Sequence, residues 1–217
     1  MATTYLSRTE VAGSTDFGKK FTVSVWFKKS GKGVTETLWA TGTGGSDGTD
    51  LVFDTNDNFT FEAYDGSANP KIITDREFRD PGAWYHLCVA VDTTQVTDTN
   101  RVKIYFNGVQ ETEFSTETYP AENYVFPGIG TTADTMKVGL GVMYGSAYWN
   151  GEMAHLHYTD GQVYAPTAFG ETDATSGIWI PISGPSVTYG NNGMFLKFAS
   201  GATLTDSSGN GNNMTLG

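Results

Sequence analysis

Apolar residues occupy every second position in several segments of the chain. The alternation is clearest in residues 21–28, 101–106, 136–140 and 153–158, where mostly polar or small residues separate the apolar ones. Successive side chains of a strand point to opposite faces, so this pattern predicts strands with one face on a hydrophobic core. The residues that we expect in that core are Phe21, Val23, Val25, Leu87, Val89, Ile104, Phe106, Val138 and Leu156.

Two segments allow more detailed predictions. Residues 84–91 carry apolar or small side chains on both faces, which indicates a central strand covered on both sides. We expect this strand to pair with residues 101–108. In residues 153–158 strict alternation predicts two distinct faces, with Ala154, Leu156 and Tyr158 on one and Met153, His155 and His157 on the other.

Turn-forming residues separate these segments. Asn107-Gly108 is typical of a tight hairpin, because a type I′ turn needs positive φ at both central positions. A polar stretch at residues 54–58 predicts a second hairpin. Helical periodicity is missing apart from one short turn near residues 166–169. The chain is therefore expected to form one all-β domain over residues 1–217, an antiparallel β-sandwich with more than ten strands.

Composition narrows the classes of partner. The formal charge of −11 argues against nucleic acid and anionic membranes, which attract basic surfaces. Cys88 is the only cysteine, so packing rather than an intrachain disulfide must stabilise the fold. The sequence contains neither a signal-peptide pattern nor an apolar stretch of about 18 residues. We therefore predict that the protein folds in a cytoplasm and does not insert into a membrane.

Several motifs resemble known families. Residues 84–92 and 101–109 resemble the core hairpin of laminin-G-like domains. A closer resemblance, to domains of marine bacteriophage and algal-virus proteins, runs in order through residues 5–9, 78–86, 148–151, 160–162, 169–171 and 206–212. The resemblance implies a concanavalin A/laminin-G-like jelly roll.

The resemblance also implies a function. In that viral family such domains belong to fibres, spikes and head decorations, which predicts a virion structural protein assembled in a host cytoplasm. Its partners would be capsid proteins or host-surface glycans, engaged by a homo-oligomer or an array of copies. The alternatives are a free carbohydrate-binding lectin and a degenerate glycoside hydrolase.

Candidate catalytic residues are few. Laminarinase-like enzymes of this fold need carboxylates spaced as E-x-D-x-x-E, which place a nucleophile and an acid on either side of the sugar bond. Glu171-Thr172-Asp173 lacks the last glutamate, and Glu111 and Glu113 lack a third partner. A zinc site would need Cys88 brought to the histidines His86, His155 and His157, and packing explains these residues better. We predict that the protein is not an enzyme.

Calcium is the ion that the sequence fits best. Residues 206–211 resemble the first half of a calcium loop, with Asp206 and Asn210 among its oxygen donors, but the glutamate expected at the twelfth position is replaced by Gly217. Asp47 and Asp50 follow a glycine-rich loop and form a second candidate pair. In both places an ordinary structural turn is the alternative.

Aromatic residues in loops are candidates for glycan or interface contact, because large amphipathic rings stack on sugars and are enriched at interfaces. Tyr144, Tyr148 and Trp149 lie in a glycine-rich segment, and Tyr119 and Tyr124 lie on either side of a proline. The alternative is that these rings close the ends of the sandwich.

Overall fold

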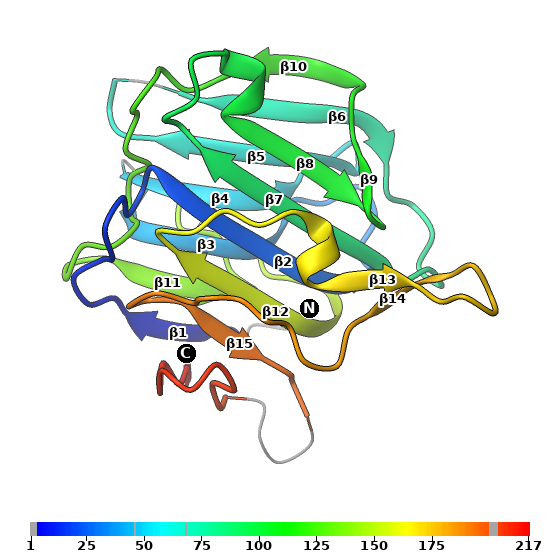
Figure 1. Cartoon of the computed structure of the whole chain (residues 1–217). Helices are drawn as coiled ribbons and strands as arrows, with labels where there is room; N and C mark the ends of the chain where they lie inside the picture. The colour runs from blue at the N-terminus through cyan, green and yellow to red at the C-terminus, as the bar shows by residue number, and fades with distance from the viewer. Residues whose placement is uncertain (1–3, 46, 68, 200–203) are drawn as a thin grey trace.

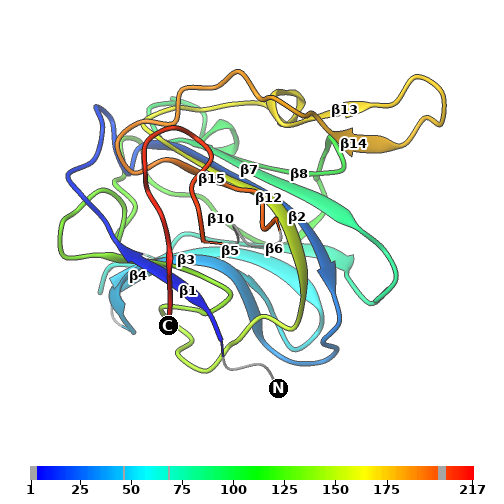
Figure 2. The same ribbon diagram turned by 90° about the horizontal axis from the view of Figure 1, so that it is seen from below.

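Two antiparallel sheets lie face to face in the computed structural model, which describes residues 4–45, 47–67, 69–199 and 204–217 (Figures 1 and 2). The elements are β1 (Leu6–Thr9), β2 (Lys20–Lys29), β3 (Glu36–Gly44), β4 (Asp47–Phe53), β5 (Asn58–Tyr64), β6 (Lys71–Glu77), β7 (Tyr85–Asp92), the 3₁₀ turn η1 (Asp98–Asn100), β8 (Val102–Phe106), β9 (Val109–Gln110), β10 (Phe114–Thr118), β11 (Thr135–Val138), β12 (Gly151–Asp160), the 3₁₀ turn η2 (Pro166–Ala168), β13 (Gly170–Thr172), β14 (Trp179–Pro181), β15 (Met194–Leu196) and β16 (Thr215–Leu216).

The sheets differ in size. The larger has eight strands in the order β10-β6-β5-β4-β3-β11-β1-β16, and the smaller has six in the order β15-β12-β2-β7-β8-β9. A separate hairpin, β13–β14, projects beside the smaller sheet (Figure 2). The predicted antiparallel all-β sandwich is confirmed. Among the described residues, no helix has the length and hydropathy that crossing a membrane requires.

The space between the sheets holds the predicted core. All nine residues expected there are at most 3% exposed. Strand β7 is interior to its sheet, with β2 on one side and β8 on the other, as predicted. The β8–β9 turn has φ of 50° at Asn107 and 80° at Gly108, which confirms the turn type expected from the sequence.

The prediction for residues 153–158 is wrong. The register of β12 against β2 runs from Ala154 opposite Trp26 to His157 opposite Ser24, so one extra residue is inserted between them. His155, at this bulge, has a φ of 48°. The insertion reverses the alternation, and Ala154 shares the outer face with His157 rather than the inner face with Leu156 and Tyr158.

Residues 162–182 cover the outer face of the smaller sheet, crossing in front of β2 and β7 in Figure 1. Tyr164 N–H donates to the hydroxyl of Thr22, and Trp179 packs beside His86. This cover explains why Cys88, on the outer face of β7, is fully buried. The predicted burial of β7 on both sides is therefore confirmed.

Candidate functional site

A groove of about 630 Å³ lies on the outer face of the smaller sheet, against the β13–β14 hairpin. One wall consists of residues 177–181 of the hairpin. The floor and the other wall are made by β2, β12, the residue before β7 and the β8–β9 turn. The residues that supply them are Trp26, Trp84, Asn107, Ala154 and His155.

A stack of three rings supports the groove. The His86 ring lies between the Trp26 and Trp179 rings, with centroid distances of 5.0 Å and 5.9 Å and interplanar angles of 27° and 30°. The Trp179 indole Nε1–H donates to His86 Nδ1 over 3.0 Å, and His86 Nε2 lies 2.8 Å from the Ser24 hydroxyl. An indole nitrogen can only donate, so the His86 proton must reside on Nε2 and point to Ser24. Burial lowers the pKa of His86 to about 3, which keeps this ring neutral.

Two glycines make room for the Trp179 ring. A Cβ added to Gly108 would lie 2.7 Å from the Trp179 ring, and one added to Gly170 would lie 2.6 Å from it. Gly108 also has positive φ, so the turn residue that forms the hairpin also permits the close approach of the indole.

The rim of the groove is exposed and apolar. Trp84, directly before β7, is 41% exposed, and Ile178, directly before β14, is 62% exposed. Large apolar side chains with this exposure at the edge of a concave surface are typical of binding sites.

The lining carries no formal charge. None of the described residues that line the groove is Asp, Glu, Lys or Arg. Among the described lining residues the only ionisable group is His155, and burial together with the nearby charge of Lys197 lowers its pKa below the ordinary value. A chain of net charge −11 thus presents an uncharged aromatic groove at neutral pH.

The aromatic loop predicted as a contact lies elsewhere, over the outer face of the larger sheet. Tyr144 is partly exposed and its hydroxyl donates to Glu62. Tyr148 is half-buried beside Tyr5, with ring centroids 6.3 Å apart. Trp149 is only 7% exposed and packs against Phe27, so it belongs to the core. For Trp149, the alternative interpretation that the ring packs within the sandwich is therefore the correct one.

Tyr119 and Tyr124 are half-buried at a loop on another side of the molecule. The Tyr119 hydroxyl donates to Glu117, and the Tyr124 hydroxyl donates to Asp65. The Tyr124 ring also packs edge-on against the core residue Phe126 at 5.1 Å. Neither tyrosine lines the groove that contains Trp26, Trp84 and Trp179, which is called the three-tryptophan groove below.

The four calcium candidates act within turns and strands. Asp206 accepts hydrogen bonds from the backbone N–H groups of Phe195, Ser208 and Asn212, and Asn210 donates to two backbone carbonyls. Asp50 is buried, and its oxygens accept from two backbone N–H groups of the Tyr144 loop; Asp47 is partly buried at the start of β4. In the part of the chain that the structure describes, no group of three or more His, Cys, Asp and Glu side chains is arranged to hold a metal ion.

The candidate catalytic carboxylates do not form a catalytic pair with one another. Glu111 is buried and forms an ion pair with Arg76 at 2.9 Å, whereas Glu113 and Glu171 are exposed. The structure does place Asp50 and Glu62 opposite each other on β4 and β5. These two carboxylates receive their hydrogen bonds from the Tyr144 loop, which covers them.

The histidines are engaged in packing. His157 lies over Phe195 with ring centroids 3.9 Å apart, and burial lowers its pKa well below the ordinary value. Burial likewise raises the pKa of the Cys88 thiol, which makes it unreactive.

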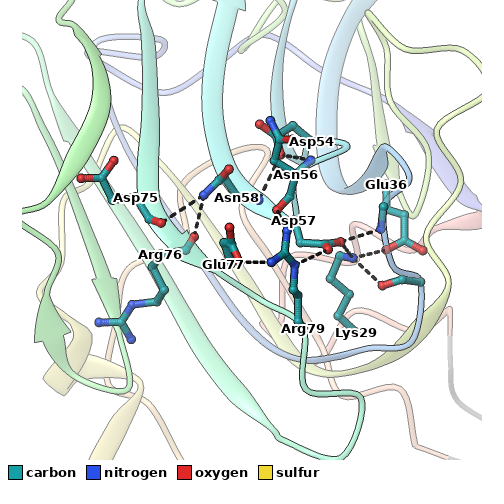
Figure 3. Close-up of polar contacts among 12 residues, drawn as sticks. Lys29, Glu36, Asp54, Asn56, Asp57, Asn58, Asp75, Arg76, Glu77 and Arg79 are labelled. Atoms are coloured by element: carbon teal, nitrogen blue, oxygen red, sulfur yellow. Dashed lines mark hydrogen bonds and ion pairs between the residues drawn. The ribbon is translucent and has the colours of Figure 1, made fainter.

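A cluster of charged side chains lies at the end of the sandwich where β2 meets the β4–β5 turn (Figure 3). The Lys29 ammonium lies 2.8 Å from an Asp57 oxygen and 3.3 Å from a Glu36 oxygen, and all three side chains are buried. Arg79 contacts the other Asp57 oxygen at 3.1 Å. The opposite charges neutralise one another, so this cluster has the character of a structural network.

Sequence reasoning did not single out the three tryptophans of the groove. Trp26 stands among Thr22 and Ser24 on the polar side of its strand, an unusual place for a large ring. Trp179 lies between two isoleucines after a glycine turn, an apolar cluster that no predicted strand used. Both signals are visible in the sequence, but neither says that the two rings meet.

Residues 2–163 match the family model described as the concanavalin A-like lectin/glucanases superfamily. The chain belongs to this superfamily. No protein of curated function matches the chain in sequence. The β13–β14 wall of the groove lies beyond the matched residues.

Solved structures share the fold at low sequence identity. A putative carbohydrate binding protein from Bacteroides ovatus superimposes with a TM-score of 0.58 and 14% identity, covering 100% of this chain and 58% of that one. Domain 4 of an extracellular arabinanase from Geobacillus stearothermophilus, in complex with arabinotriose, has a TM-score of 0.52 and 22% identity, covering 72% of this chain and 65% of that one. A heptameric pentraxin from Limulus polyphemus has a TM-score of 0.51 and 16% identity, covering 83% of this chain and 86% of that one. These likenesses concern the fold: the chain has a carbohydrate-binding-like sandwich.

Proposed function

We propose that this chain is a non-catalytic carbohydrate-binding domain that holds a glycan in the groove between Trp84, Trp26 and Trp179. The observation that carries the proposal is the groove itself: an exposed indole at the rim, two further indoles in the lining, and no formal charge among the described lining residues. The apolar face of a sugar ring stacks on such rings, and a few polar groups fix its orientation.

The same geometry supports a non-catalytic role. Glycoside hydrolysis uses two carboxyl groups about 5–9.5 Å apart around the sugar bond. The described lining of the groove contains none, and Asp50 and Glu62, which stand opposite each other in the larger sheet, lie beneath a loop. These facts support binding rather than turnover.

Binding to a glycan array, followed by titration calorimetry with the best ligand, tests the proposal. Trp84→Ala should weaken binding about tenfold or more, because truncating an aromatic side chain that stacks on the ligand removes about 2 kcal/mol or more. Val96→Ala is the matched control, since Val96 is an exposed apolar residue of a distant turn. Tyr144→Ala tests the competing loop. The proposal fails if the array shows no ligand, or if Trp84→Ala binds as the wild type does.

We further propose that the domain works in several copies on a virion, as a head-decorating or fibre module. The ordered motif resemblance to viral structural domains supports this role. A shallow sugar site binds weakly alone, and repeated copies raise avidity by about 10²–10⁴ when several sites engage together. Immunogold electron microscopy of native particles provides the test: label on the particle surface supports the role, and label confined to the soluble fraction contradicts it.

A further inference from the structure

The lining of the three-tryptophan groove includes one unpaired hydrogen-bond donor and one nitrogen that can accept. Among the described residues, Trp26 Nε1 and His155 Nδ1 are buried and have no hydrogen-bond partner in the protein. Both residues line the groove from adjacent strands: Ala154 stands opposite Trp26 in the β2–β12 register, and His155 is the next residue. Trp26 Nε1–H can only donate, whereas Nδ1 of a neutral histidine accepts when its proton is on Nε2. A buried donor or acceptor left unpaired destabilises the free protein, so a ligand that satisfies both atoms gains affinity by pairing them.

The bulge in β12 directs His155 to this place. An L-residue with φ near 48° is strained, and the strand would continue without strain if the extra residue were absent. Bulges commonly re-aim a side chain beside a functional site. Here the re-aimed residue carries one of the two buried polar atoms of the described lining that have no partner in the protein.

The opposite wall is apolar. Ile178, Ile180 and Pro181 line it, and no charged side chain accompanies them among the described lining residues. A ligand that fits both walls must present an acceptor and a donor close together, with a small apolar group beside them. An acetamido group has this arrangement: its carbonyl accepts, its N–H donates and its methyl is apolar.

We infer that the groove selects glycans containing 2-acetamido-2-deoxy sugars, an inference that rests on the proposed function. The acetamido carbonyl accepts from Trp26 Nε1–H, the acetamido N–H donates to His155 Nδ1, and the methyl packs on the isoleucine wall. Both nitrogens are buried and belong to residues that line the groove, so this mode of binding requires the β13–β14 hairpin, which is outside both main sheets, to shift when the group enters.

The test compares two trisaccharides that differ only at this substituent: chitotriose, with three acetamido groups, and cellotriose, with hydroxyls instead. Wild-type protein should bind chitotriose at least about tenfold more tightly, the equivalent of one to two additional hydrogen bonds. Trp26→Phe keeps a ring and removes the donor, so it should lower chitotriose affinity about tenfold and leave cellotriose affinity unchanged. Ile178→Ser, at the exposed rim, should reduce the preference without affecting the fold.

The outcomes separate the two proposals. Equal binding of the two trisaccharides, or a different glycan whose binding is lost in Trp84→Ala, overturns the acetamido inference and leaves the carbohydrate-binding function in place. Loss of all glycan binding overturns both. A third competitor, an N-acetylated peptide without sugar, must compete at least about tenfold more weakly than chitotriose; equal competition would mean that the groove binds peptide amides, which overturns the inference. Should Trp26→Phe unfold, the wild-type comparison and Ile178→Ser decide alone.

Discussion

Replacing Lys29 by methionine removes the only positive charge that contacts Glu36 among the described residues. Methionine keeps much of the length and volume of the lysine stem, so the change isolates the ammonium. Lys29 is 2% exposed, and both carboxylates that it contacts are buried as well. Figure 3 shows Asp57 in contact with both Lys29 and Arg79, so Asp57 should retain Arg79 after the change, whereas Glu36 should keep no cation among the described residues.

The expected cost is about 3–5 kcal/mol of the free energy of unfolding, because a carboxylate stays buried without its counter-charge. Urea unfolding followed by tryptophan fluorescence measures it, with an unchanged slope showing that the unfolding transition itself is intact. Lys28→Met is the matched control. Its neighbouring ammonium pairs with the exposed Glu152 at 3.2 Å and should cost about 1 kcal/mol or less.

Acidity provides an independent check of the cause. Burial raises the pKa of Glu36, and removal of Lys29 raises it further, so Glu36 in the variant takes up a proton more readily as the pH falls. The difference in stability between Lys29→Met and the wild type should therefore shrink with falling pH, and adding Glu36→Gln should recover part of it at neutral pH. A cost under about 1 kcal/mol, or one that stays constant with pH, would refute the electrostatic account.

Further outcomes are expected elsewhere in the molecule. Leu87→Ala should cost about 2–5 kcal/mol in urea unfolding through lost burial and a cavity, and a cost under about 1 kcal/mol would contradict its central position. Gly108→Ala should displace the Trp179 ring, seen as a shift of tryptophan emission and weaker glycan binding; an unchanged spectrum and affinity would contradict the close contact. Burial raises the pKa of Glu10 from 4.5 to about 7, so the native state binds this proton more tightly and stability should fall as pH rises through that window. Glu10→Gln should remove part of this slope in a thermal unfolding series, and equal slopes would count against the assignment. His155→Gly should be more stable than His155→Ala by about 1 kcal/mol, because only alanine carries a Cβ at the positive φ; equal midpoints would argue against strain at the bulge.

The fold was predictable because its signals are local. Period-two alternation in residues 21–28 and 101–106, with Asn107-Gly108 directly after the second, needs only neighbouring residues to form and to be recognised. The resemblance then supplied the jelly-roll architecture, which no local pattern contains. The prediction failed at residues 153–158, because a bulge changes the face of a residue without changing the composition of the segment.

The groove was harder to predict because its parts are distant in the sequence. Trp26, Trp84 and Trp179 meet only when the segment after β12 folds back across the smaller sheet. A glycine-rich segment with aromatic residues, such as the one containing Tyr144 and Trp149, has the same composition whether its rings face solvent or the core. Burial of Trp149 depends on the sheet beneath it, which the segment itself does not encode.

The cost of building the groove is the strongest reason to regard it as functional. A strained histidine at the β12 bulge and an unpaired indole N–H in Trp26 each reduce stability, and a packed sandwich needs neither. Proteins retain such departures from local preference mainly where a site requires them. The wall that completes the groove lies outside the residues matched by the family model. The shared sandwich therefore supplies a platform, and the segment after residue 163 supplies the wall on which the proposed ligand selectivity depends.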